Sequence, residues 1–325
     1  MKAWSCRRYG GPETLELVDM PKPVPGNDEI LVRIHAVTVS SGDARIRACR
    51  LPRGFGLIGR LLLGFTGPRK PVLGTDLAGT VEAVGENVHN FAPGDEVIAF
   101  PGGAMGCHAQ YRNVSTKMPM ARKTANLSFE EAVSLIFGGM TALHFIKKAG
   151  LKPGENILVI GGSGAVGSAM VQIARHMGAE VTAVTSAANA DLAVSLGAAK
   201  VIDYAREDFA KNPAAFDVIA DTVGASNFAR CVSALKENGR YLSVSGELTG
   251  LFARPVGTKR SIGGPASEKA EYLHEIVALA EQGALRPVID STYDFAHLPD
   301  GHARVDTGHK RGSVVVAVAE NVSAG

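Results

Sequence analysis

Short apolar runs separated by turn-forming residues dominate the first third of the chain. Residues 29–36, 79–84 and 96–100 are rich in β-branched and aliphatic side chains, and glycine, proline, asparagine or aspartate bounds each run. The Pro-Gly-Asp sequence at 93–95 is typical of a tight turn between two strands. We therefore expect residues 1–121 to form a β-rich domain.

From residue 129 onwards, segments with the apolar spacing of helices alternate with short apolar runs. Residues 129–148 predict a helix that the Gly138-Gly139 pair interrupts. Alternation of helices and strands requires right-handed crossovers, and it predicts a parallel sheet covered on both faces. We assign residues 122–264 to this second domain. Its further helices are expected at 165–177, 191–196 and 228–235, and its strands at 156–160, 181–185, 201–203, 218–221 and 241–245.

The last part of the chain loses this rhythm. A helix at 268–282 is followed by an extended stretch at 287–289, a helix near 299–306 and a strand at 314–318. We interpret these elements as a return to the first domain, which then consists of residues 1–121 and 265–325. The expected fold class is α/β, with a discontinuous β-rich domain and a doubly wound parallel-sheet domain.

Composition and charge narrow the class of protein. The chain has 325 residues, enough for two domains, and a formal net charge of +2, which does not by itself indicate a nucleic-acid partner. Its apolar runs are far shorter than the roughly 20 residues that span a bilayer, and the N-terminus lacks the apolar core of a signal peptide. The four cysteines form no C-x-x-C pair, as is usual in a reducing compartment. We predict a cytoplasmic protein without a membrane span or a nucleic-acid partner.

A glycine-rich turn carries the strongest chemical signal. The expected strand at 156–160 runs into a G-x-G-x-x-G pattern on Gly162, Gly164 and Gly167, and a helix follows. The three glycines allow a tight turn, a close approach of the backbone to a pyrophosphate and close helix–strand packing. The N–H groups and the positive end of the helix dipole then bind the pyrophosphate. The alternative is a tight strand–helix turn without a ligand, and the flanking elements favour a nicotinamide dinucleotide.

The end of the next strand bears on which cofactor is bound. Val184-Thr185-Ser186 lacks the aspartate or glutamate that NAD sites place against the ribose hydroxyls. The missing carboxylate removes repulsion against a 2′-phosphate, although no Arg or Lys lies at 186–190 to pair with that phosphate. Ser186 and Asn189 are able to donate hydrogen bonds there. The sequence therefore favours NADP(H) over NAD(H).

Motifs along nearly the whole chain carry a family resemblance. They are Tyr9-Gly10-Gly11-Pro12 and residues 29–47, 71–79, 84–85, 93–97, 138–142, 161–167, 196–198 and 308–315. With them the chain resembles the medium-chain dehydrogenase/reductase superfamily, and most closely its zinc-independent, quinone oxidoreductase-like branch. The resemblance implies a GroES-like first domain, a Rossmann second domain and a nicotinamide in the cleft between them. It also implies a homodimer joined through an edge strand near residues 261–263.

The resemblance further implies site residues. Ser40, Ser41 and Thr141 are the expected catalytic residues, with Thr141 near the nicotinamide. The substrate is polarised by the hydroxyl of Ser40 or Ser41, or by the ribose of the cofactor. The backbone at 243–246 is expected beneath the nicotinamide. The implied cofactor-binding residues are Gly162, Ser163, Gly164, Ala165, Val166, Gly167, Thr185, Ser186, Asn189, Tyr204, Ser245 and Gly246.

The chain also departs from its family at three points. Zinc-dependent members have a cysteine in the region 40–43 and a histidine after Gly74, where this chain has Ser40, Ser41, Gly42, Asp43 and Thr75. A zinc site needs about three protein ligands, which cannot be assembled here, so we expect no metal. The branch often has Asn-Pro in place of Ser40-Ser41, and an arginine near position 188 where NADPH is held.

The predicted function is NAD(P)H-dependent reduction of a quinone, enone or related carbonyl compound, with a small apolar or quinonoid molecule held against the nicotinamide. One alternative is a zinc-free alcohol dehydrogenase. A second is an NADPH-sensing or partner-binding protein with little turnover, because fold alone does not determine function.

Two features have more than one interpretation. His108 is either a site residue or a packed core residue. Residues 45–70 contain seven basic and no acidic residues around the apolar stretch 55–63. This segment is a packed helix with solvated arginines, a rim that admits an apolar substrate, or a contact for anionic lipid or nucleic acid.

Overall fold

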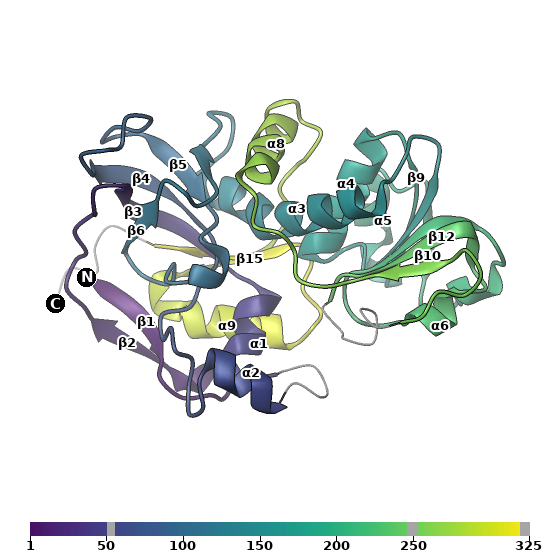
Figure 1. Ribbon diagram of the computed structural model, residues 1–325, viewed down its shortest axis with the longest axis horizontal. Coiled ribbons are helices and arrows are strands. Elements are labelled where there is room, and N and C mark those ends of the chain that lie inside the picture. Colours follow the sequence, from purple (N-terminus) through teal and green to yellow (C-terminus); the bar gives the residue numbers. More distant parts are fainter. Residues whose placement is uncertain (51–55, 246–252, 319–325) are drawn as a thin grey trace. The chain divides into compact units, whose positions relative to one another are not determined.

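The computed structural model describes residues 1–50, 56–245 and 253–318, which fold into two compact units (Figure 1). The first unit comprises Met1–Phe137, Glu268–Glu281 and Pro287–Gly325. The second comprises Gly138–Ser267 and Gln282–Arg286. Because C-terminal segments join the first unit, that unit is discontinuous in sequence.

The first unit is built mainly from antiparallel strands. Its seven-stranded sheet has the order β14-β15-β3-β4-β5-β7, with β6 paired to β3, and β1 and β2 form a separate two-stranded sheet. The β14–β15 pair is parallel, and the other pairs between described strands of this unit are antiparallel. The core consists of aliphatic side chains such as Val32, Leu77, Val97 and Val314, which are fully buried. The strands are β1 (Lys2–Cys6), β2 (Leu15–Asp19), β3 (Glu29–Val39), β4 (Leu77–Val84), β5 (Glu96–Ala99), β6 (Tyr111–Ser115), β7 (Met120–Arg122), β14 (Ile289–Asp294) and β15 (Ser313–Ala317).

Helices pack against this sheet from distant parts of the sequence. Helix α9 (Leu298–Asp306) has a proline in its first turn and packs against β14 and β15, while α8 (Ala270–Glu281) packs against β7. Helix α9 also contacts α1 (Ser41–Arg47), and the two lie side by side in Figure 1. The short α2 (Gly56–Leu63) follows α1 in the chain. The contact of α1 with α9 ties the two ends of the first unit together.

The second unit contains a six-stranded parallel sheet. Its order is β10-β9-β8-β11-β12-β13, and Leu158 of β8 is paired with Thr182 on one side and Ile219 on the other. The strand order reverses between β8 and β11, and ligands of such sheets bind outside the carboxyl ends of the strands at this switch point. The elements are β8 (Asn156–Ile160), α4 (Ala165–His176), β9 (Glu180–Thr185), α5 (Ala190–Ser195), β10 (Lys200–Asp203), β11 (Phe216–Asp221), α6 (Phe228–Cys231), β12 (Leu235–Ser243) and β13 (Arg260–Ile262).

Helix α3 (Phe129–Ala149) is continuous, so the predicted interruption at Gly138-Gly139 is wrong. A Cβ on Gly138 would lie 2.3 Å from the carbonyl oxygen of Ala165, so this glycine lets α3 and α4 pack closely instead of ending a helix. Helix–helix packing here outweighs the propensity cost of glycine, about 1 kcal/mol. By length and composition α3 is apolar enough to span a membrane, but 72% of its apolar window is buried inside the protein.

The helix predicted at 228–235 is also shorter than expected. Asn227 caps α6, which ends at Cys231, and β12 begins at Leu235. Leu235 is paired with Phe216 of β11, and the Ala234 carbonyl accepts a hydrogen bond from the Phe216 N–H at 3.0 Å. Pairing with the neighbouring strand therefore overrides the helical spacing of the apolar residues.

Candidate functional site

The glycine-rich turn follows β8 directly. A Cβ on Gly167 would lie 2.0 Å from the carbonyl oxygen of Gly161, and a Cβ on Gly162 would lie 2.9 Å from the Cβ of Ala183. These two glycines are required by the packing of the turn against its own unit. Gly164 differs, because its Cβ would meet only the Gly161 oxygen at 3.5 Å, an ordinary contact. The bare backbone at Gly164 therefore fits the close approach of a pyrophosphate.

Helix α4 begins immediately after this turn. Gly164 is its N-cap and contributes no side-chain hydrogen bond to the first helical turn. The first helical N–H groups have no partner within the helix, and the helix dipole adds positive charge at the same place. Ala165, Val166 and Gly167 lie in this first turn, so the predicted pyrophosphate ligands form one continuous cradle of N–H groups.

Three of the predicted cofactor residues meet in one hydrogen-bonded cluster. Thr185 Oγ1 donates to Ser163 Oγ at 2.9 Å, and Asn189 Nδ2 donates to the same oxygen at 3.2 Å. Ser163 and Thr185 are buried, whereas Ser186 is only half-buried and makes no side-chain capping bond to the short helix that follows it. The cluster ties the glycine turn to the end of β9. The hydroxyl of Ser186 is therefore more accessible to a ribose than the hydroxyls of Ser163 and Thr185.

A cavity of about 480 Å³ lies at the carboxyl edge of the parallel sheet. Ile160 and Val184, the ends of β8 and β9, contribute apolar wall, and Tyr204 after β10 is 63% exposed. The Tyr204 N–H donates to the Thr185 carbonyl at 3.3 Å, which holds the tyrosine next to the Ser163 cluster. Sequence reasoning did not identify the other members of this cavity, which are Ala205, Arg206, Glu207, Asp208, Phe209, Lys211, Ala225 and Arg230. The sequence did offer a signal for them, namely the basic residues Arg206 and Lys211 shortly after the third strand of this unit. That strand is β10, which pairs with β9, so residues that follow it lie close to the end of β9.

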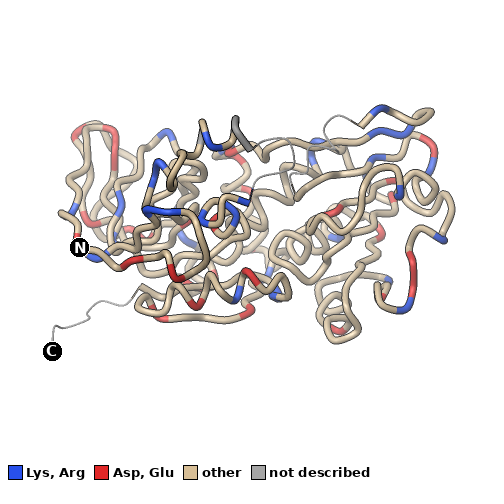
Figure 2. Tube along the Cα trace, turned by 90° about the horizontal axis from the view of Figure 1, so that it is seen from below, with Lys and Arg blue, Asp and Glu red and all other residues tan. Residues whose placement is uncertain are grey.

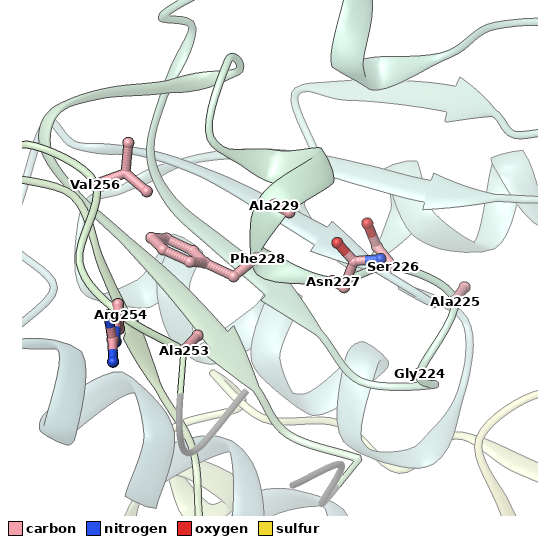
Figure 3. Close-up of a pocket in the computed structure, with 9 residues that line it drawn as sticks. All are labelled: Gly224, Ala225, Ser226, Asn227, Phe228, Ala229, Ala253, Arg254 and Val256. Atoms are coloured by element: carbon pink, nitrogen blue, oxygen red, sulfur yellow. The ribbon is translucent and has the colours of Figure 1, made fainter. Parts of the chain in front are cut away.

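The loop after β11 is held by one buried carboxylate. Asp221 Oδ1 accepts hydrogen bonds from the backbone N–H groups of residues 223, 224 and 225, and its Oδ2 accepts from the N–H of Ser226 at 2.7 Å. The Tyr241 hydroxyl donates to the same carboxylate at 3.3 Å. This arrangement fixes the loop at the switch point of the sheet. A second cavity, of about 580 Å³, borders the loop, and Figure 3 shows Phe228 directed into it beside Ala253 and Val256.

The remaining predicted residues of the second unit lie on two elements. Ser245 is half-buried just beyond the end of β12, and Gly246 lies outside the described residues. Thr141 is half-buried on α3, one turn after Gly138. Because Gly138 packs on the Ala165 carbonyl, this part of α3 lies against the start of α4.

Ser40 and Ser41 lie in the first unit and differ in role. Ser40 is buried and caps α1: its Oγ donates to Asp43 Oδ2 at 2.6 Å and accepts from the Asp43 N–H at 3.1 Å. The other carboxylate oxygen of Asp43 accepts from the Gly74 N–H at 3.0 Å. Ser41 is exposed at the first position of α1. The Ser40 hydroxyl is thus committed to the helix cap, whereas the Ser41 hydroxyl faces solvent.

His108 belongs to the buried core of the first unit. Its ring is fully buried, Nε2 lies 3.1 Å from the Thr38 carbonyl oxygen, and burial lowers its pKa. The ring fills the space beside Gly74, whose φ is +95° and whose Cβ would lie 2.6 Å from the imidazole. Of the two interpretations of this histidine, the packed core residue fits these contacts.

The described residues contain no group of three or more His, Cys, Asp or Glu side chains placed to hold a metal ion. Cys107 is fully buried, and burial raises the pKa of its thiol to about 12. A thiol with so high a pKa is a poor source of the thiolate that metals bind.

A buried carboxyl group beside Ser40 predicts a pH-dependent stability. Burial raises the pKa of Asp76 from 3.8 to about 7, although the Thr38 N–H and hydroxyl donate to it at 3.0 and 2.8 Å. Between these pKa values the folded protein retains a proton that the unfolded chain releases, so this stabilisation is present at low pH and is lost as the pH rises through about 7. We therefore compare the free energy of unfolding of Asp76→Asn with that of wild type. We expect the difference to shift by about 4 kcal/mol in favour of the variant between pH 4 and pH 8.

Urea unfolding of both proteins at several pH values measures this difference. Both retain His108 and His302, whose pKa values burial lowers, so their contributions cancel in the comparison. The control is Asp300→Asn, at an exposed position in the first turn of α9, for which we expect no such trend. A flat difference between Asp76→Asn and wild type would contradict the prediction.

A discontinuous β-rich unit joined to a doubly wound nucleotide-binding unit defines a dehydrogenase of the two-domain type. Residues 26–155 match the family description "Alcohol dehydrogenase GroES-like domain", and residues 196–316 match "Zinc-binding dehydrogenase". The chain belongs to the medium-chain dehydrogenase/reductase superfamily and is quinone oxidoreductase-like. The predicted family and fold class are thereby confirmed.

Individual relatives support an enzymatic activity. The 2-methylene-furan-3-one reductase of Solanum lycopersicum is 33% identical over 97% of this chain and 79% of its own length. The solved quinone oxidoreductase of Coxiella burnetii superposes with a TM-score of 0.86 at 29% identity, covering 98% of this chain and 99% of its own. A mycobacterial protein solved with NADPH has a TM-score of 0.80 at 25% identity, covering 98% and 100%. The protein is an NAD(P)H-dependent oxidoreductase, as the sequence predicted.

Proposed function

We propose that this protein reduces a quinone, an enone or a related carbonyl compound with NADPH, and that it does so without zinc. The observation that carries the proposal is the glycine turn at the sheet's switch point, beside the cavity lined by Ile160 and Tyr204. The names of similar proteins, a quinone oxidoreductase and a 2-methylene-furan-3-one reductase, support the substrate class. When bound, the nicotinamide supplies the hydride, and the protein supplies binding and orientation.

Different residues of the chain bind different parts of the cofactor and the substrate. In this proposal the N–H groups of residues 163–167 hold the pyrophosphate, with Gly164 allowing the close approach. Tyr204 and Ile160 cover the adenine, and Ser186 and Asn189 face the ribose. Thr141 and residues 243–246 position the nicotinamide. Ser41, the exposed hydroxyl at the start of α1, polarises the substrate, while Ser40 orders that helix through Asp43.

The absence of zinc is proposed from the chemistry of the residues at the positions of zinc ligands. Ser40, Ser41 and Thr75 carry neutral hydroxyls, and Asp43 is already occupied by the N–H groups of Ser40 and Gly74. These positions hold neither Cys nor His. Cys107 and His108 lie beside Gly74, but burial raises the pKa of the Cys107 thiol to about 12 and His108 Nε2 lies 3.1 Å from the Thr38 carbonyl oxygen, whereas a catalytic zinc needs about three ligands. Elemental analysis of the purified protein tests this proposal, and stoichiometric zinc would overturn it.

The preference for NADPH rests on charges around the cavity. No acid lies at 185–190 to repel a 2′-phosphate, and Arg206 and Lys211 line the adjoining cavity. Arg206 Nε forms an ion pair with Asp203 Oδ2 at 3.6 Å, and its side chain is 85% exposed, so in this proposal it exchanges that partner for the phosphate. We propose that these cations replace the arginine that related enzymes carry near position 188.

A single substitution tests the cofactor and the reaction together. We expect Arg206→Ala to raise the KM for NADPH about twofold to fivefold, as for one exposed ion pair, and to leave the KM for NADH unchanged. The control is Lys152→Ala, which removes an exposed cation of the second unit that does not line the cavity. Absorbance of the nicotinamide band is followed with a panel of quinones, enones and alcohols.

The panel also separates the alternatives. Oxidation of alcohols without reduction of quinones or enones would favour the zinc-free alcohol dehydrogenase. Tight binding of NADPH without turnover of any compound would favour the sensor or partner-binding protein. Tighter binding of NADH than of NADPH would overturn the cofactor preference.

A homodimer and a cytoplasmic location are part of the same proposal. Among the described strands, β13 is an edge of the parallel sheet and pairs only with β12. In this pairing Ser261 lies opposite Tyr241, and Ile262 lies opposite Leu242. An edge of this kind is able to continue the sheet into a second copy. Similar plant and animal proteins are named for the chloroplast and the mitochondrion, so the compartment depends on the source of the chain.

A further inference from the structure

A basic and apolar surface of the first unit is unused by the proposed reaction. We call it the basic patch and define it as Arg7, Arg8, Arg60, Leu61, Phe65, Arg69 and Lys70. All seven side chains are exposed, and Leu61 and Phe65 are each 55% exposed, among the most exposed large apolar residues described. Figure 2 shows lysines and arginines on neighbouring stretches of this unit.

Backbone contacts make this surface continuous. The Tyr9 N–H donates to the Thr66 carbonyl at 3.3 Å, and the Tyr9 hydroxyl donates to the Gly64 carbonyl at 2.8 Å. A Cβ on Gly67 would lie 2.0 Å from the Arg7 carbonyl oxygen, so the two strands of chain are in close contact there. Residues 7–9 and 64–67 therefore run side by side, so Arg7 and Arg8 lie on the segment adjacent to the one that carries Phe65.

The far side of the patch is joined to helix α2. Arg69 Nη2 donates to the Leu61 carbonyl at 2.7 Å, and the Arg69 N–H donates to the Leu63 carbonyl at 2.6 Å. Lys70 Nζ donates to the Gly103 carbonyl at 3.0 Å. These bonds use carbonyl oxygens, so they hold the cations in place without neutralising their charge.

Acidic residues are scarce around the patch. Residues 1–12 and 44–75, the two segments that build it, contain no aspartate or glutamate. Of the acids that approach from other elements, Asp306 is paired with Arg47 and Arg50, Glu13 accepts from the Gly11 N–H, and Glu268 accepts from the Gly103 N–H. Five exposed cations thus share this surface with two exposed apolar side chains, with little opposing charge.

We propose that the basic patch docks on the surface of an anionic phospholipid bilayer. Lys and Arg side chains are attracted to anionic headgroups, and exposed apolar side chains between them enter the boundary with the acyl chains. A nucleic-acid duplex would use the cations but would have no use for the exposed Leu61 and Phe65, so the lipid surface fits both kinds of residue. This interaction needs neither cofactor nor turnover and goes beyond the proposed reaction.

Vesicle co-sedimentation of the full chain tests the proposal. The vesicles contain phosphatidylcholine alone or phosphatidylcholine with about 30% phosphatidylserine, chosen to resemble the charge of an anionic leaflet. We expect binding to the phosphatidylserine vesicles at least tenfold tighter than to neutral vesicles, and weaker binding at high salt because the charges are exposed. Equal binding to both kinds of vesicle would overturn the proposal.

Two double variants separate the charged and apolar parts. We expect Arg7→Gln with Arg8→Gln, and Leu61→Ser with Phe65→Ser, each to weaken vesicle binding at least threefold. The control is Lys152→Gln with Arg175→Gln, which removes two exposed cations of the second unit and is expected to bind like wild type. Thermal unfolding, measured separately, shows whether each variant is folded. Unchanged vesicle binding of either patch variant, or tighter binding of a short DNA duplex than of phosphatidylserine vesicles, would overturn the proposal.

Discussion

Replacement of Gly167 by alanine is expected to raise the Kd for NADPH at least a hundredfold and to destabilise the second unit. The new Cβ would lie 2.0 Å from the Gly161 carbonyl oxygen and 2.9 Å from the Gly162 Cα. Both neighbours are backbone atoms of the same turn, so the clash cannot be relieved by rotating a side chain. The turn or helix α4 must shift, and the N–H groups at the start of α4 then lose their alignment.

Gly164→Ala provides the matched comparison for this prediction. Its Cβ would make only an ordinary contact, so we expect its thermal unfolding to match wild type while NADPH binding weakens. Thermal unfolding and fluorescence titration with NADPH are measured for both variants. If Gly167→Ala bound NADPH within threefold of wild type, the assignment of this turn to the dinucleotide would be wrong.

Replacement of Arg47 by alanine is expected to cost about 3–5 kcal/mol of folding free energy, the usual result of breaking a buried ion pair. The Arg47 side chain is fully buried and pairs with Asp306 of α9. It also donates to the Gly10 carbonyl at 2.8 Å and to His302 Nδ1 at 3.3 Å. Its loss leaves these acceptors without their donor and opens a cavity between α1 and α9.

Arg50→Ala is the control, because Arg50 pairs with the same carboxylate from a side chain that is 52% exposed. Solvent screens that pair, so we expect a cost of less than about 1 kcal/mol. Urea unfolding curves of the two variants measure both values. If the two substitutions reduced the free energy of unfolding by similar amounts, burial of Arg47 would not be the reason for the strength of its interactions.

Elements with strong local patterns were predictable from the sequence. The strands at 156–160 and 181–185 are short runs of mainly apolar and β-branched residues because both faces of a parallel sheet are buried, and they appear as β8 and β9. The glycine turn was also predictable, because a tight turn between a strand and a helix restricts which residue types fit at each of its positions. The pair Gly138-Gly139 led to the wrong prediction of a helix interruption, because glycine also allows two helices to pack closely. Such packing depends on a partner distant in the sequence, which here is Ala165.

The candidate site could be predicted only in part. Ser163, Thr185 and Asn189 were selected individually, but the structure joins them in one hydrogen-bonded cluster. Arg206 and Phe209 were not selected, because they follow the third strand, and only the order of strands in the sheet brings the end of β10 beside β9. The hydroxyls of Ser40 and Ser41 are indistinguishable in the sequence, and the cap to Asp43 separates them.

The sequence by itself determined the parallel-sheet unit, the glycine turn and the lack of Cys and His at the positions of zinc ligands, because each depends on residue type and short spacing. The tertiary structure alone decided the burial of His108, the pairing of Arg47 with Asp306 and the close approach of Arg7 to Gly67. These contacts join residues far apart in the chain, and their energies depend on burial and on neighbouring charges that no local pattern records.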